Sequence, residues 1–86
     1  MNKLLVQLSP VQLYHKIYVI QDGVIIKQTK VTNKNLSDTI NTFLQEYSID
    51  NITLSGAKSY TTKIGSDLKI HLNTNYSQAH ITIDYV

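Results

Sequence analysis

The sequence predicts an α/β domain of the α+β type, a small mixed β-sheet with two helices packed on it. Three observations indicate this class: an Asp-Gly pair at 22–23 joins two β-rich runs, apolar residues recur at helical spacing over 35–47 and 57–72, and residues 79–86 alternate between apolar and polar. With 86 residues and 42% hydrophobic content, the chain is expected to form a single domain, because a second would leave neither half enough interior to fold.

A β-hairpin is predicted from residue 13 to residue 32. The Asp-Gly pair accepts the positive φ values that a two-residue type I′ turn requires, and it joins strands at 13–21 and 24–32. The first strand has apolar residues on both alternations, which indicates that both faces are at least partly covered. The second strand starts apolar and ends polar, which predicts that it leaves the core between Lys27 and Lys30.

A helix, a short strand and a second helix follow the hairpin. Asn35 is the predicted N-cap of the first helix. The β-rich run at 52–55 forms the strand, and Gly56 closes it. Gly65 lies inside the second helix, where a glycine costs about 1 kcal/mol relative to alanine. It either allows close packing or marks a kink.

The two ends of the chain are each predicted to contain a strand. The alternation over 79–86 gives a last strand with one buried and one wetter face. With a strand at 3–8 the order becomes (β)ββαβαβ, and residues 1–10 are expected to form an edge strand or an arm that covers an edge or a partner. Counted without the strand at 3–8, the third and fourth strands are those at 52–55 and 79–86. If these two run parallel, the second helix is a crossover connection between them.

This order of elements resembles a trimmed ribonuclease H-like or actin-like core. The resemblance implies acidic metal ligands on the first central strand and on later strands. The run at 13–20, taken as that central strand, contains no acid. The resemblance therefore extends to the pattern of elements and not to nuclease chemistry.

Composition excludes several classes of protein. There is no cysteine, so disulfides, thiolate zinc sites and cysteine nucleophiles are excluded. The longest apolar run, at 17–20, is far shorter than the roughly 20 residues that span a bilayer. Residues 1–10 lack the pattern of a secretory signal. We expect a soluble cytoplasmic protein with no membrane partner.

The acidic residues and histidines are the candidates for metal or acid-base chemistry. Asp22 and Asp38 have local roles in a turn and in the first turn of a helix, and the remaining acids are not expected to meet at one end of the sheet. His15, His71 and His80 show no metal-binding spacing and are interpreted as structural or surface residues. We therefore expect no catalytic or metal site, no cofactor and no enzymatic activity.

One segment has the character of a ligand site, because a strand there passes through a glycine into the start of a helix. Free N–H groups at a helix N-terminus can hold a phosphate or a carboxylate. The Gly-x-Lys-Ser order at 56–59 shares part of the phosphate-binding loop pattern but lacks its first glycine and its length. The candidate anion or ligand residues are Ser55, Gly56, Lys58 and Ser59. The alternative is an ordinary turn in which Ser55 or Gly56 caps the helix.

Lysines and tyrosines make the candidate interaction surface. The formal net charge is +2, and all eight basic residues are lysine. The absence of arginine disfavours sequence-specific reading of nucleic acid. Tyrosine is enriched at protein interfaces and also stacks on bases. The candidate residues are Tyr14, Tyr18, Lys27, Lys30, Lys34 and Tyr76.

Three segments resemble small phage- or prophage-encoded proteins of unassigned function. They are the end of the first hairpin strand with its turn at 18–23, the run at 47–56 and the start of the second helix at 60–64, and the resemblance covers 14–86. It implies no active site. It does imply a viral accessory role in the host cytoplasm, such as binding and blocking a host factor or a defence complex.

Three functions follow from these observations. The leading expectation is a non-enzymatic protein-interaction module that binds itself or a host or viral protein complex, as an inhibitor of host defence would. The alternative is an accessory protein that binds nucleic acid through its lysines and tyrosines. The third is an enzyme or ligand-binding domain centred on residues 56–59.

Overall fold

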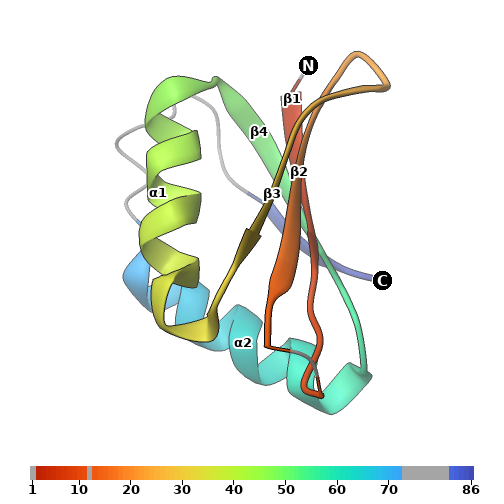
Figure 1. Ribbon diagram of the computed structural model, residues 1–86, viewed down its shortest axis with the longest axis vertical. Helices are drawn as coiled ribbons and strands as arrows, with labels where there is room; N and C mark the ends of the chain where they lie inside the picture. The colour runs from red at the N-terminus through yellow and green to blue at the C-terminus, as the bar shows by residue number, and fades with distance from the viewer. Residues whose placement is uncertain (1, 12, 73–81) are drawn as a thin grey trace.

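Five strands form one mixed sheet in the order β3-β2-β1-β4-β5 (Figure 1). The computed structural model describes residues 2–11, 13–72 and 82–86. The strands are β1 (Asn2–Gln7), β2 (His15–Gln21), β3 (Val24–Val31), β4 (Ile49–Ser55) and β5 (Thr82–Tyr85). Strand β2 is antiparallel to both of its neighbours, whereas β1, β4 and β5 are parallel to one another. The predicted mixed sheet of an α+β domain is confirmed.

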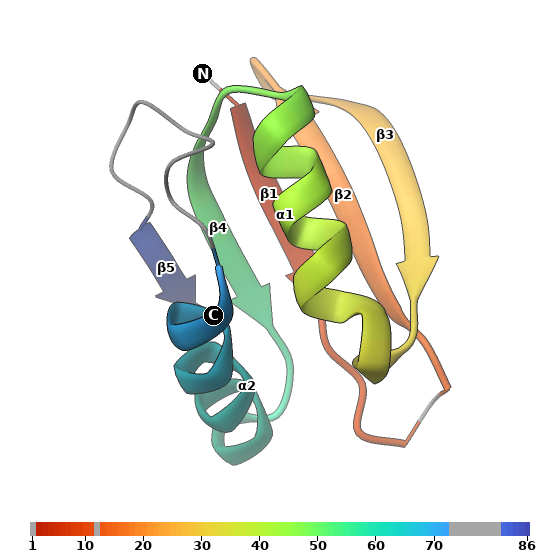
Figure 2. The same cartoon turned by 90° about the vertical axis from the view of Figure 1, so that its left-hand side faces the viewer.

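Both helices lie on the same face of the sheet (Figures 1 and 2). Helix α1 (Leu36–Glu46) follows a short 3-10 turn, η1 (Asn33–Asn35), and connects β3 to β4. Helix α2 (Lys58–His71) connects the parallel strands β4 and β5, as a crossover helix does. Neither helix in the described part of the chain is long and apolar enough to cross a membrane.

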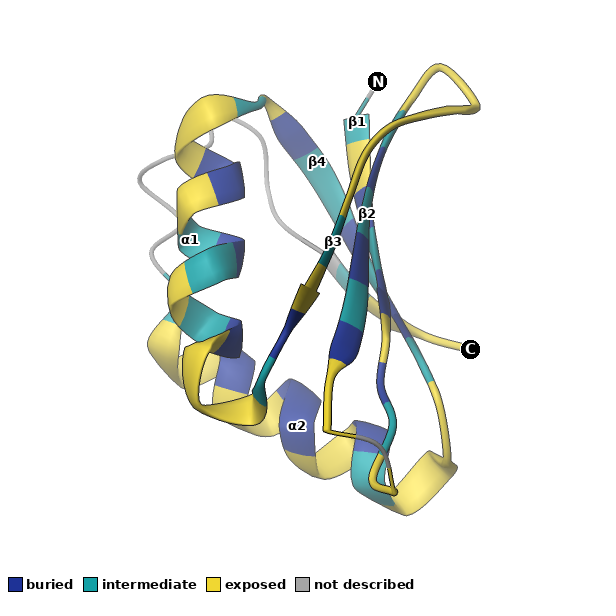
Figure 3. Cartoon of the chain, in the orientation of Figure 1, coloured by how far each residue is buried: buried dark blue, intermediate teal, exposed yellow. Residues whose placement is uncertain are grey.

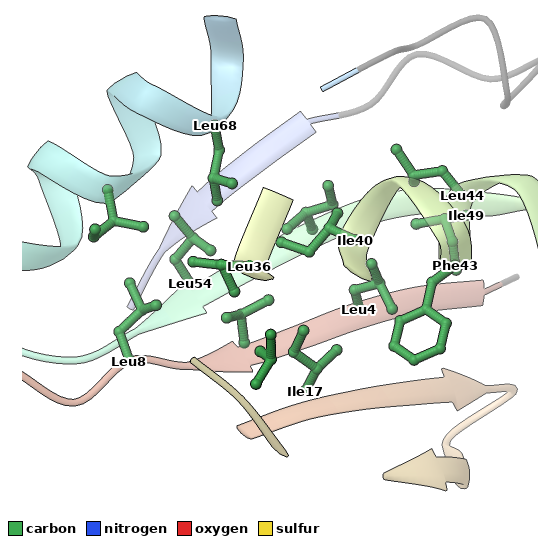
Figure 4. Close-up of a cluster of buried hydrophobic side chains, with 14 of the residues drawn as sticks. Leu4, Leu8, Ile17, Leu36, Ile40, Phe43, Leu44, Ile49, Leu54 and Leu68 are labelled. Carbon is green, nitrogen blue, oxygen red and sulfur yellow. The ribbon is translucent and has the colours of Figure 1, made fainter. Parts of the chain in front are cut away.

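The core lies between the helices and the face of the sheet that they cover (Figures 3 and 4). Alternate residues of the three central strands point into it and are fully buried. These fully buried strand residues are Leu4, Val6, Ile17, Val19, Ile49, Ile52 and Leu54. The helices contribute Leu36, Ile40, Phe43, Leu44, Ile64 and Leu68. Each such side chain stabilises the fold by about 1.5–3 kcal/mol through burial.

Strand β1 is the central strand of the sheet. It pairs with β2 on one side and with β4 on the other. The prediction that residues 1–10 form an arm or an edge strand is therefore wrong. Partners on both sides occupy the backbone groups that an edge strand leaves open, and Leu4 and Val6 are completely buried beneath the helices.

The hairpin has the predicted turn. Asp22 and Gly23 both have positive φ, 51° and 82°, as a type I′ turn requires. The predicted course of β3 is wrong, since its apolar start at 24–26 is exposed and the strand is buried only at Val31 (Figure 3). Helix α1 lies over β1 and β2 and α2 beside β4 and β5 (Figure 2), so neither of these described helices covers the start of β3.

Two further details differ from the sequence prediction. Asn35 stands at the N-cap of α1 but makes no capping hydrogen bond, because its backbone (φ −101°, ψ 4°) belongs to the preceding 3-10 turn and not to the extended conformation of a typical N-cap. Its amide Nδ2 donates to Thr32 Oγ1 at 3.3 Å. Strand β4 starts at Ile49, three residues earlier than the predicted start at Ile52. Burial of Ile49 beneath α1 explains the earlier start.

Gly65 allows close packing, which is one of the two roles predicted for it. The residue is buried in α2, and the ring of Tyr85 on β5 lies against it. A methyl group at this position would lie 2.7 Å from Cε1 and 2.9 Å from Cζ of Tyr85. The first residues of the predicted last strand, 79–81, lie outside the described residues.

Candidate functional site

A cleft of about 460 Å³ lies where β4 passes into α2. Its lining residues are Gly56, Lys58, Thr61, Thr62, Tyr85 and Val86. The parallel strands β4 and β5 both end here, since Leu54 pairs with Tyr85. The carboxyl ends of parallel strands are the usual place for ligands in open α/β sheets, so the topology favours this end of the molecule.

The start of α2 lacks the features that normally stabilise a helix N-terminus. The N-cap is Ala57, no described side chain caps the helix, and its first turn contains Lys58 but no acid. An alanine N-cap costs about 1 kcal/mol relative to serine or aspartate, and the helix dipole disfavours a cation at this end. The N–H groups of the first turn are thus left to other acceptors.

The four predicted ligand residues are adjacent here, but only two of them line the cleft. Gly56, with a φ of 157°, and Lys58 line it. Ser55 is the last residue of β4, and Ser59 is exposed in the first helical turn. The alternative in which Ser55 or Gly56 caps the helix is wrong, because the N-cap position falls on Ala57. Sequence reasoning missed the other lining residues.

A second cavity, of about 750 Å³, lies at the opposite end of the sheet. Its lining residues are Asn2, Lys3, Ile20, Asp22, Gly23, Asp50, Asn51 and Asp84. Three acids line it, Asp22 of the hairpin turn together with Asp50 and Asp84. The described residues nevertheless contain no group of three His, Asp or Glu residues that could hold a metal ion.

Two of these carboxylates connect neighbouring strands. Oδ2 of Asp50 accepts a hydrogen bond from the backbone N–H of Asn2 at 3.3 Å, and Oδ2 of Asp84 accepts one from Nδ2 of Asn51 at 2.8 Å. They therefore tie β1 and β5 to β4. The resemblance to ribonuclease H-like cores implies acids on the central strand, but β1 contains none.

His15 is buried, with 3% of its surface exposed. Its Nδ1 accepts a hydrogen bond from the backbone N–H of Ser9 at 3.1 Å. The ring proton is therefore assigned to Nε2, which lies 3.2 Å from Oδ1 of Asn33 and 3.5 Å from the hydroxyl of Tyr60. His15 thus connects the segment after β1 to η1 and α2.

His71 is the last residue of α2. Its Nδ1 lies 3.0 Å from the carbonyl oxygen of Asp67, one helical turn earlier. His71 therefore lies at the C-terminal end of the helix, among its last carbonyl groups. His80 lies outside the described residues.

Among the described strands β3 is an edge strand, and it is exposed and apolar at its start. The exposed fractions are 61% for Val24, 56% for Ile25 and 44% for Ile26. The ladder between β2 and β3 shifts register after Val19, where a bulge lies in β3 beside these residues. Bulges and lysines are the features by which proteins protect edges against unwanted pairing.

The predicted interaction lysines do not share a face. Lys27 lies opposite the buried Val19, on the side of the helices, whereas Lys30 lies opposite Lys16 on the other side of the sheet. Lys34 is in η1. The alternation of a strand, which turns residues 27 and 30 to opposite faces, separates them.

None of the described helices covers the second face of the sheet, called here the open face (Figures 1 and 2). Strands β1 and β2 present alternating residues to it, with Lys3 and Leu5 on one and Lys16 and Tyr18 on the other. The Tyr18 hydroxyl donates to Oε1 of Gln7 at 3.2 Å. Tyr14 is exposed just before β2, and the predicted surface residue Tyr76 lies outside the described residues.

Comparison with known proteins adds no functional assignment. No protein-family model and no curated protein matches this chain. Among solved structures the chain is similar to Pelota from Archaeoglobus fulgidus, at 11% identity and a TM-score of 0.49. The match covers 99% of this chain and 26% of Pelota, so this chain spans about a quarter of that protein.

Proposed function

We propose that this chain is a non-enzymatic protein-interaction module that binds an extended segment of a partner along β3. The observation that supports this proposal is the exposed apolar start of an edge strand at 24–26. An edge strand presents unpaired N–H and C=O groups to which a further strand can add. Apolar side chains beside those groups supply the area that a peptide buries on binding.

The charge of this region favours an acidic partner. Between residues 23 and 37 the chain contains Lys27, Lys30 and Lys34 and no acid. Two copies paired through β3 would place four lysines along one seam, and like charges on adjacent strands repel. A segment that combines acidic and apolar residues complements both features, so we assign the partner to another protein.

The phage origin, the host-defence target and the self-association predicted from the sequence stay predictions. A binding edge on β3 is compatible with a phage origin and a host-defence target, because a protein that inhibits a host complex by binding to it needs no catalytic site. Self-association would use a surface other than β3, for the reason of charge given above.

A capture experiment with two matched variants tests the β3 proposal. Ile25→Glu places a negative charge on the edge and removes an apolar contact, and we expect it to weaken capture of the partner about tenfold or more. The control is Ile70→Glu, the same change on α2, where the isoleucine is 78% exposed. The wild-type chain and both variants are immobilised, and the partner retained from a lysate of the native host is quantified by mass spectrometry.

The identity of the bound segment completes this test. A photo-crosslinking residue at Gln28 of β3 is expected to label an acidic, extended segment of the captured protein. Equal losses of capture with Ile25→Glu and Ile70→Glu would contradict the proposal. Cross-links to a basic or helical segment would contradict it as well.

A second candidate function, binding of single-stranded nucleic acid, is favoured by the open face. Lys16 and Lys30 are cross-strand neighbours there, Tyr18 lies two residues along β2, and Lys3 lies on β1. A tyrosine between lysines can stack on a base while the lysines contact phosphates. These lysines differ from the set predicted from the sequence, which shares only Lys30 with them.

Fluorescence anisotropy with a labelled single-stranded oligonucleotide tests this second candidate. With three phosphate contacts, the slope of log K against log salt is expected to be about −2. Tyr18→Ala is expected to weaken binding about tenfold, while Tyr18→Phe, which keeps the aromatic ring, is the control and leaves the affinity nearly unchanged. An affinity that does not change with salt would eliminate this function.

A further inference from the structure

Thr61 contains a buried hydroxyl group without a hydrogen-bond partner. The residue is 1% exposed, and its Oγ1 is the buried side-chain atom without a partner among residues 2–11, 13–72 and 82–86. Its neighbour Thr62, by contrast, donates to the carbonyl oxygen of Lys58 at 2.8 Å. Buried polar groups in native proteins are almost always paired, so a missing acceptor at Thr61 calls for an explanation.

The hydroxyl faces the glycine at the entrance of α2. A Cβ atom built on Gly56 would lie 2.9 Å from Thr61 Oγ1 and 2.9 Å from the carbonyl oxygen of Leu8. Both Gly56 and Thr61 line the cleft at the ends of β4 and β5. A side chain at position 56 would therefore crowd the hydroxyl.

The first turn of α2 begins at this cleft, and of its residues Lys58 lines it. The N–H groups of Lys58, Ser59 and Tyr60 have no acceptor within the helix, because the first backbone hydrogen bond runs from Thr61 to Ala57. No described side chain caps them. Lys58 adds a positive charge at the rim, and no acid is among the described residues that line the cleft.

We propose that this cleft binds an oxyanion, the phosphate or carboxylate group of a small molecule. The hydroxyl of Thr61 and the N–H group of Lys58 donate to its oxygens, and the Lys58 side chain balances its charge. Tyr85 and Val86 form the opposite wall, which suits an apolar body attached to the anionic group. The proposal is independent of β3, which lies at the far edge of the sheet.

A titration followed by NMR tests the site with defined probes. Inorganic phosphate and acetate are added separately to the folded chain at constant ionic strength, with sodium chloride as the reference. Saturable shifts of the amide signals of residues 58–60 are expected with at least one of the two anions, together with a rise in Tm. A response to phosphate alone assigns a phosphate group, and a response to acetate alone assigns a carboxylate.

Three variants connect the response to the proposed donors. Thr61→Val keeps the shape of the side chain and removes the hydroxyl, so binding is expected to weaken about tenfold. The ligand-free variant is expected to be at least as stable as the wild type, because an unpaired buried group is gone. Lys58→Gln is expected to weaken binding, and Lys63→Gln, on the same helix but outside the cleft, is the matched control.

Several results would overturn the proposal. One is the absence of a saturable shift with either anion. Another is equal binding by Thr61→Val and the wild type, which would make the hydroxyl irrelevant. Shifts that chloride reproduces would indicate a general effect of salt on the helix. An internal water on Thr61 combined with no response to either anion would show how the hydroxyl is satisfied without a ligand.

Discussion

Replacing Leu4 by alanine is expected to lower the free energy of unfolding by about 3 kcal/mol. Leu4 lies at the centre of β1, is completely buried and packs beneath the helices. Its loss leaves a cavity that the surrounding strands and helices cannot fill, because both neighbours of β1 hold it in place. For a domain of this size such a change is a large fraction of the total stability.

The adjacent Leu5 is the matched control, with the same residue type on the same strand but on the open face. It is half-buried, and Leu5→Ala is expected to cost about 1 kcal/mol. Chemical denaturation of both variants measures the difference. If β1 were an arm or an edge strand, the two substitutions would have similar small effects, and that result would contradict the sheet order.

Replacing Gly56 by alanine is expected to destabilise the protein by about 2 kcal/mol or more. Its φ of 157° disfavours a residue with a side chain, and the new methyl group would lie 2.9 Å from the carbonyl oxygen of Leu8. That oxygen belongs to the backbone, and Leu8 is tied to β4 by the hydrogen bond from its N–H to the Ser55 carbonyl oxygen at 2.7 Å. It cannot move aside without loss of this contact.

The glycine of the hairpin turn provides the comparison. Gly23 also has positive φ, 82°, but a Cβ atom there would meet nothing within 4 Å. Gly23→Ala is therefore expected to cost about 1 kcal/mol, from backbone conformation alone. Thermal and denaturant unfolding of both variants separate the two contributions. Equal costs would mean that the crowding around Gly56 has no effect on stability.

Local signals in the sequence predicted the elements of the fold well. The type I′ turn depends on Asp22 and Gly23 alone, and the two helices depend on apolar spacing within single segments. Local signals did not predict the central position of β1 in the sheet. That position is decided by the pairing of β1 with β2 and with β4, which lies far along the chain. Nothing within residues 2–7 specifies those neighbours.

The exposed start of β3 shows the same limit. The pattern from Val24 to Val31 correctly indicated that only part of the strand enters the core. It predicted burial of the start of the strand, whereas the residue that is buried is Val31 at its end. Burial of β3 depends on which strands the helices cover, and α1 lies over β1 and β2 (Figure 2). That arrangement is not visible in the alternation of a single strand.

The candidate ligand site was half predicted. The strand, glycine and helix order identified Gly56 and Lys58, because the signal lies within a few consecutive residues. Thr61 was missed, since a threonine in a helix reads as a surface residue. Thr61 lies three residues before Ile64 and four before Gly65, which are both buried. This helical spacing was the signal that Thr61 faces the core. Tyr85 comes from a strand distant in sequence, and only the fold places it there.

The most direct test of the proposed function is amide hydrogen exchange of the chain with and without its captured partner. If the partner adds a strand to this sheet, the amides of β3 between Val24 and Val31 that point away from β2 exchange more slowly in the complex, because they gain acceptors. The amides of α2 keep their rates. Unchanged exchange along β3, with protection on α2 or on β5 instead, would contradict the account.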